Sequence, residues 1–102
     1  MTRRKQLEEL LKEDSNDAFL QYGLALEDAK EGEVLGAASR LEKLLKDQPE
    51  YLGAYYQLGQ WYEQLSEIEK AKAIYELGIV LAKKLGNKKT EGEMRTALEN
   101  LE

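Results

Sequence analysis

Carboxylates are the most abundant reactive side chains in this chain of 102 residues, so they are the first candidates for catalysis. Glu27 and Glu31 lie one helical turn apart, and pairs of carboxylates can act as general acid and base across a cleft when one has a raised pKa. Here the acidic residues are interspersed with lysines, which is typical of a solvated helix face. The pattern favours a surface role, and we expect no enzymatic activity.

Histidine and cysteine are both absent. Their absence excludes disulfides, zinc sites of the Cys/His type, thiol nucleophiles and every catalytic triad that contains histidine. The sequence also has no glycine-rich phosphate loop and no metal-ligand spacing. We therefore expect neither a cofactor nor a metal.

The charge balance argues against nucleic acid as a partner. Twenty acidic and fifteen basic residues give a net charge of −5, which repels phosphate backbones. The densest basic group, Arg3-Arg4-Lys5, is interpreted as the solvated start of a helix. Because no apolar run is long enough for a membrane span or a signal core, we expect a cytoplasmic protein that does not bind membranes. The initial Met favours a complete protein over a piece of a longer array.

The apolar spacing is helical almost throughout and predicts about six helices. Asp14-Ser15-Asn16, Glu31-Gly32 and Pro49 separate the first four, and Pro49 is also expected to open the fourth. A capping box of Ser66 and Glu69 is predicted to start the fifth helix, which is the longest. Three further expectations concern its end and its successor: Gly86 ends the fifth helix, Asn87 or Thr90 caps the sixth, and Met94 and Leu98 lie on the apolar stripe of the sixth.

One residue pattern occurs twice. The second copy reads Tyr55-x-x-Leu58-Gly59-x-x-Tyr62 and then Ala71-x-x-x-Tyr75, and the first reads Phe19-x-x-Tyr22-Gly23-x-x-Leu26 and then Ala37-x-x-x-Leu41, with Pro49 after it. The alanines are 34 residues apart and the glycines 36, so two extra residues are expected around Lys30–Glu33. The small residues are expected where the two helices of a repeat approach closely, and the aromatic residues where the gap is wider.

This pattern resembles the tetratricopeptide repeat. The resemblance implies an all-α fold, a right-handed α-solenoid of antiparallel helix pairs. It also implies one domain over residues 1–102, divided into an N-terminal helix of a partial repeat (1–14), two repeats (16–49 and 50–85) and a C-terminal capping helix (87–102).

The resemblance further implies that the first helix of each repeat lines a concave groove for a partner protein or peptide. The matching positions carry apolar, aromatic, amide and acidic side chains: Leu20, Leu24, Glu27, Tyr56, Gln57, Gln60, Glu63 and Gln64. They suit a ligand with apolar side chains and a basic residue. The family's clamp for a terminal carboxylate uses Lys and Asn, which Leu20, Leu24 and Gln57 do not supply.

Two interpretations stay open for this surface. In one, the chain is a scaffold or adaptor that binds a partner in the groove; in the other, it self-associates as a homodimer or larger homo-oligomer. Leu20 and Leu24 could equally pack under the N-terminal helix, with Tyr56 at the edge of the core. Trp61 is expected to fill space between helices, although aromatic residues are also common in binding hot spots.

Overall fold

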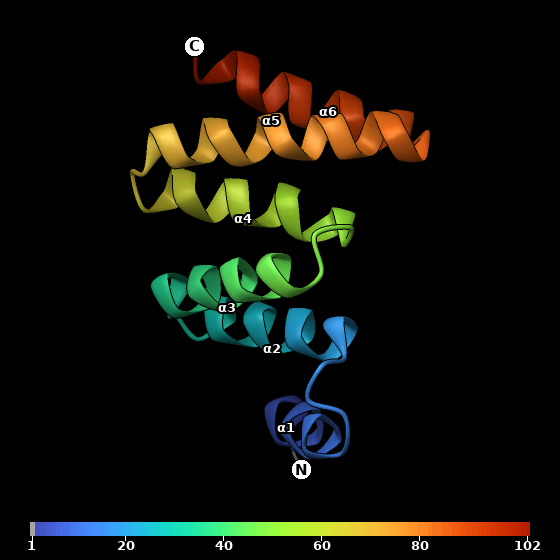
Figure 1. Ribbon diagram of the computed structural model, residues 1–102. Helices are drawn as coiled ribbons and strands as arrows, with labels where there is room; N and C mark the ends of the chain where they lie inside the picture. The colour runs from blue at the N-terminus through green and yellow to red at the C-terminus, as the bar shows by residue number, and fades with distance from the viewer. Residues whose placement is uncertain (1) are drawn as a thin grey trace. The chain divides into compact units, whose positions relative to one another are not determined.

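Residues 2–102 are described by a computed structural model, in which they form six helices and no strand (Figure 1). The all-α prediction is therefore confirmed. The helices are α1 (Arg3–Glu13), α2 (Ala18–Lys30), α3 (Val34–Asp47), α4 (Leu52–Gln64), α5 (Ile68–Leu85) and α6 (Lys88–Asn100). None of these six combines the length and the hydropathy that crossing a bilayer requires.

Local signals explain where most helices begin and end. Asp17 caps α2 by accepting a hydrogen bond from Leu20 N at 3.1 Å. Asn87 caps α6 in the same way, through Thr90 N at 3.0 Å, which decides between the two predicted caps. Gly86 ends α5 with a φ of 72°, as expected for a left-handed helix end.

Two predicted helix starts are wrong. Ser66 does not cap α5; it lies in the preceding loop with a φ of 60°, and no side chain caps this helix. Gly32 holds the matching place before α3 with a φ of 88°, so this loop needs a left-handed residue, and Ser66 supplies it at some cost. Pro49 lies in the loop before α4, which begins only at Leu52.

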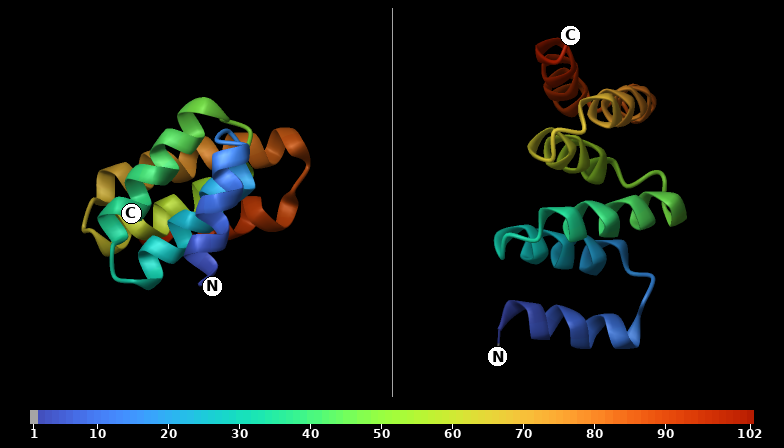
Figure 2. Two further views of the ribbon diagram at one scale, coloured as in Figure 1. Left: turned by 90° about the horizontal axis from the view of Figure 1, so that it is seen from below. Right: turned by 90° about the vertical axis from the view of Figure 1, so that its left-hand side faces the viewer.

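The chain divides into two compact units. The N-terminal unit ends at Pro49 and contains α1 to α3, and the C-terminal unit begins at Glu50 and contains α4 to α6. The division falls at the predicted boundary between the two repeats. In the N-terminal unit α3 packs antiparallel on α2, while α1 crosses α2 steeply (Figures 1 and 2). In the C-terminal unit α5 packs on both α4 and α6.

Each unit contains its own set of buried apolar side chains. The larger buried side chains of the N-terminal unit are those of Leu7, Leu24, Leu41, Leu44 and Leu45. Those of the C-terminal unit are Tyr55, Leu58, Trp61, Tyr62, Tyr75, Ile79 and Met94. Trp61 is buried, as its predicted packing role requires. The C-terminal unit thus relies on aromatic side chains where the N-terminal unit relies on leucines.

The helix bounds correct the predicted alignment of the repeats. Helices α2 and α4 both have 13 residues. Ala18 and Leu52 begin them, and Glu13 and Asp47 end α1 and α3, so each pair of equivalent bounds is 34 residues apart. The expected two-residue insertion is therefore absent.

Burial supports the constant spacing. Phe19, which the sequence pattern paired with Tyr55, is 66% exposed, whereas Tyr55 is 7% exposed. The structural counterpart of Tyr55 is Gln21, and the counterpart of Gly59 is Ala25 rather than Gly23. A Cβ added at Gly23 would lie 3.2 Å from Leu7 Cδ1, so this glycine accommodates α1 and not its partner helix α3. Gly23 faces α1, whereas Gly59 faces α5, so aligning these two glycines by residue type gave the wrong spacing.

Candidate functional site

The predicted site residues of the C-terminal unit share one helix, α4. We call Tyr56, Gln57, Gln60, Glu63 and Gln64 the α4 face. Gln60 and Gln64 are exposed, and the other three are half-buried. Spacings of three and four residues place such side chains on neighbouring turns of one helix. The α4 face is therefore open to solvent at Gln60 and Gln64, and it is anchored at Tyr56 and Glu63.

The side chain that anchors the α4 face is that of Tyr75 in α5, whose ring lies against α4 at Gly59. A Cβ at Gly59 would lie 2.2 Å from Tyr75 Cε1, so only glycine leaves room for this ring. The Tyr75 hydroxyl donates a hydrogen bond to Glu63, and its ring centroid lies 6.3 Å from that of Tyr56 in a tilted arrangement. Tyr75 thus holds Tyr56 and Glu63 of the α4 face in place.

Electrostatics keep this contact protonated. Burial raises the pKa of the Tyr75 hydroxyl, and its hydrogen bond to the Glu63 carboxylate raises that pKa further. The hydroxyl therefore remains a hydrogen-bond donor to Glu63 at neutral pH. The outcome is an aromatic ring and a carboxylate of defined position beside two exposed amides.

The predicted site residues of the N-terminal unit lie in a different setting. Leu24 is 2% exposed and belongs to the interior. Leu20 is half-buried, and Glu27 forms an ion pair with Arg3 of α1 at 3.5 Å. The structure therefore does not gather these three side chains into an open surface like the α4 face.

Next to them lies an ion-pair cluster that the sequence did not reveal. Arg4 Nη2 of α1 donates to Asp28 Oδ1 at 2.6 Å, and Arg40 Nε of α3 donates to Asp28 Oδ2 at 2.9 Å. Arg4 Nε also donates to Glu31 at 3.1 Å. Burial by itself would raise the pKa of Asp28, but the hydrogen bonds from both arginines hold it below its ordinary value. Asp28 thus links all three helices of this unit.

The constant spacing of 34 residues identifies other counterparts for the α4 face. These are the α2 residues Tyr22, Gly23, Leu26, Ala29 and Lys30. The predicted residues Leu20, Leu24 and Glu27 were chosen with a spacing of 36, two residues away from equivalence. The signal for the correct choice was in the sequence, because the pairs Ala37/Ala71 and Leu41/Tyr75 are both 34 residues apart.

The described residues hold little else that could do chemistry. Residues 2–102 contain no group of three or more His, Cys, Asp or Glu placed to hold a metal ion. Within the same range, every buried side-chain nitrogen or oxygen has a hydrogen-bond partner.

Comparison with known proteins agrees with this fold, although no protein-family model matches the chain. A TPR repeat-containing protein of Pseudomonas aeruginosa is 27% identical over 96 residues, which cover 94% of this chain and 91% of that protein. A structure of PcrH in complex with the chaperone-binding region of PopD superimposes with a TM-score of 0.86 over 96% of this chain and 74% of that one. Its identity of 16% shows the fold alone.

A tetratricopeptide repeat domain protein of Salinibacter ruber is more similar in sequence. Its solution structure matches with a TM-score of 0.82 and 35% identity, over 87% of this chain and 90% of that chain. Its crystal structure matches with a TM-score of 0.78 and 34% identity, over 83% and 94%. The sequence identity extends over most of both chains. The helix pairs, the 34-residue spacing and the motif of the second repeat point to the same family. The chain belongs to the tetratricopeptide repeat family.

Proposed function

We propose that this chain is a protein-interaction module that holds a segment of a partner protein, with the α4 face as its main contact surface. The observation that carries the proposal is the state of Tyr56 and Glu63. Tyr75 holds both in place, yet both remain half-exposed beside the open side chains of Gln60 and Gln64. A surface ordered before binding loses less conformational entropy when a partner arrives.

The chemistry of the α4 face indicates the kind of segment it would hold. The Tyr56 ring offers apolar and aromatic contact, and Gln60 and Gln64 offer amide groups that can donate and accept hydrogen bonds. Glu63 supplies the only charge of the face, and it is negative. A segment with an apolar side chain opposite Tyr56 and a basic side chain opposite Glu63 would complement this surface, in line with the ligand expected from the sequence.

The fold comparison supports the same proposal. PcrH shares this helical arrangement and is known in complex with a region of another protein, PopD. An interaction role requires no cofactor and no reactive residue, which suits a chain without histidine or cysteine.

Site-directed photo-crosslinking tests the α4 face directly. The chain has no cysteine, so Gln60→Cys gives one attachment point for a thiol-reactive photo-crosslinker. The matched control is Gln6→Cys, which replaces an exposed glutamine of α1. After irradiation in a lysate of the source organism, we expect specific cross-linked partner peptides from position 60 and only background from position 6. Equal yields of the same peptides at both positions would contradict the α4 face as the contact surface.

A substitution series then tests the same face without a label. Gln60→Arg and Gln64→Arg place positive charge beside Glu63 and should weaken capture of the cross-linked partner, because a basic side chain of that partner would be repelled. Gln6→Arg makes the same chemical change elsewhere and should leave capture unchanged. Retained capture with both α4 variants would argue against the proposed contact.

Self-association is the second candidate function, and one observation favours it. Leu77 and Val80 lie about one turn apart on α5 and are 59% and 67% exposed. Adjacent exposed apolar side chains are a common feature of protein interfaces. If a second copy covers them, light scattering should give a mass above 11.7 kDa that falls to the monomer value in Leu77→Glu. A monomeric wild-type protein at high concentration would exclude this alternative.

A further inference from the structure

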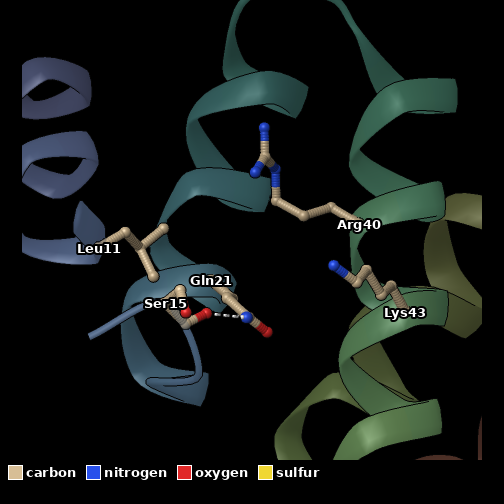
Figure 3. Close-up of a pocket in the computed structure, with 5 residues that line it drawn as sticks. All are labelled: Leu11, Ser15, Gln21, Arg40 and Lys43. Atoms are coloured by element: carbon tan, nitrogen blue, oxygen red, sulfur yellow. Dashed lines mark hydrogen bonds between the residues drawn. The ribbon is translucent and has the colours of Figure 1, made fainter. Parts of the chain in front are cut away.

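A pocket of about 200 Å³ lies within the N-terminal unit, between α1, α2 and α3 (Figure 3). Its lining comes from all three helices and from the loop that joins α1 to α2: Leu11, Ser15, Gln21, Arg40 and Lys43. In the close-up view, Leu11 extends from α1 toward α2, and the Lys43 amine extends from α3 toward the same space. None of these residues belongs to the α4 face.

Gln21 lines this pocket and differs in size from its counterpart in the second repeat. Its counterpart in the second repeat is Tyr55, a buried aromatic residue whose Cβ would lie 2.8 Å from a Cβ added at Gly78. Gln21 is smaller, and its side chain is directed to the loop, where Nε2 donates a hydrogen bond to Ser15 O at 2.7 Å. The N-terminal unit therefore lacks an aromatic ring at the position where the C-terminal unit has one.

The charged groups at this pocket are both cations. Arg40 Nε donates to Asp28 at 2.9 Å, which holds the guanidinium in place, since Asp28 is itself bound by Arg4. Lys43 is exposed, and among residues 2–102 no ion pair involves it. A fixed guanidinium can stack on an aromatic ring, and a lysine without an ion pair can bind a carboxylate. Of the two cations, Arg40 is paired with Asp28, so Lys43 provides the positive charge that remains available to a ligand.

We propose that this pocket binds an aromatic side chain that is accompanied by a carboxylate, supplied by an acidic segment of the partner. The ring takes the place that Tyr55 fills in the second repeat and lies between Leu11 and the Arg40 guanidinium. The carboxylate pairs with the Lys43 amine. This inference rests on the proposed function, because it gives the partner a second point of contact outside the α4 face.

The probe is phenylacetate, which carries one aromatic ring and one carboxylate, and the method is an NMR titration of backbone amides. We expect saturable shifts at the amides of the five lining residues, with a dissociation constant on the order of 1–10 mM, as suits a ligand of this size. Acetate lacks the ring and benzylamine carries the opposite charge, so neither should saturate these amides. Absent or unsaturable shifts with phenylacetate, or equal binding of acetate, would overturn the proposal.

Two variants test the assignment of the roles. Lys43→Glu should weaken phenylacetate binding by about tenfold or more, because it replaces the pairing charge by a repelling one. Lys46→Glu makes the same change at an exposed position of the same helix and should leave the affinity within about twofold. Gln21→Tyr should abolish binding without lowering the melting temperature, because it places the side chain of the second repeat in the pocket. Wild-type affinity in Lys43→Glu, or in a folded Gln21→Tyr, would overturn the proposal.

The titration uses no partner protein, so its outcome can be separated from that of the proposed function. If phenylacetate fails to bind while position 60 still cross-links to a partner, only the pocket assignment is lost. If the pocket binds phenylacetate while cross-linking at position 60 equals that of the control, the proposed role of the α4 face is contradicted and the pocket assignment stands.

Discussion

The helix pairs α2/α3 and α4/α5 have the same spacing but different interiors. Between α4 and α5, Gly59 makes room for the ring of Tyr75, which also binds Glu63. At the equivalent positions of α2 and α3 stand Ala25 and Leu41, both fully buried. The comparison shows that burial is preserved at these two positions, where Gly59 with the large Tyr75 in one pair corresponds to Ala25 with the smaller Leu41 in the other.

The polar groups of the two pairs differ as well. Asp28 of α2 is a buried carboxylate held by Arg4 and Arg40, and its counterpart in α4 is Tyr62. The N-terminal unit therefore contains an ion-pair cluster at a position where the C-terminal unit contains an aromatic ring. At this position the N-terminal unit therefore depends on charged contacts, whereas the C-terminal unit depends on the fit of an aromatic ring.

The largest effect is expected where the fit is tightest. Gly59→Ala should lower the free energy of unfolding by about 3 kcal/mol, because its Cβ would overlap the buried ring of Tyr75. Chemical denaturation followed by circular dichroism measures the loss. Adding Tyr75→Leu recreates the Ala25/Leu41 pair of the first repeat, so the double variant should be more stable than the sum of the single losses predicts, by about 1 kcal/mol or more. If the losses of the two single variants simply add in the double variant, the Gly59/Tyr75 and Ala25/Leu41 pairs are not interchangeable.

The ion-pair cluster should give the next largest effect. Asp28→Asn should destabilise the protein by about 2 kcal/mol at neutral pH, because it leaves Arg4 and Arg40 without their shared carboxylate. The pKa of Asp28 is lowered in the fold, so its stabilisation is present above its unfolded pKa and is lost as the pH falls through the folded value. The difference between wild type and variant should be constant from about pH 5 to 7 and shrink below about pH 4. A difference that persists unchanged at pH 3 would assign the effect to packing.

A smaller effect is expected from the hydroxyl of Tyr75. Tyr75→Phe keeps the ring and removes the hydrogen bond to Glu63, which should cost about 1 kcal/mol in urea denaturation. It should also free the Glu63 side chain, and the affinity of the α4 face for its cross-linked partner should fall by severalfold. Unchanged affinity would mean that Tyr75 contributes to the core but does not organise the α4 face.

The smallest effect has the opposite sign. Gly36 and Gly92 lie inside α3 and α6, and a Cβ added at either would meet no atom closer than 4.0 Å. Gly36→Ala and Gly92→Ala should therefore each raise the free energy of unfolding by about 0.5–1 kcal/mol through helix propensity alone. Thermal melting of each variant checks this, and lower stability in either would reveal a contact at that glycine. No packing reason for these two glycines is found in the structure.

Much of the fold could be predicted from the sequence, because helix periodicity and end signals are local. Helix breaks at Glu31-Gly32 and Gly86 follow from residue types at short range, whereas the sequence left Asn87 and Thr90 as alternative caps of α6. The predicted capping box at Ser66 failed because the loop requires a left-handed residue there, and this requirement comes from the path of the chain between two packed helices. A local motif cannot report such a constraint.

The candidate site could be predicted only in part, and the two repeats show why. In the second repeat the motif around Leu58 and Gly59 is strong, and the residues assigned from it do lie together on α4. In the first repeat Gln21 and Ala25 stand at the motif positions, and the sequence match moved instead to Phe19 and Gly23. Residue identity therefore placed the α2 counterparts of the α4 face two residues away from the structural alignment.

The sequence by itself determined that the chain is helical, that it repeats, and that it carries no histidine, cysteine or metal-ligand motif, because composition and periodicity are properties of the chain alone. The tertiary structure decided the register of the first repeat, the ion pairs of Asp28 and the pocket beside Gln21. Each of these depends on which side chains from separate helices come within contact distance. The sequence pattern allows a spacing of 34 or of 36 residues between the repeats. Only the close packing of side chains from separate helices selects one of them.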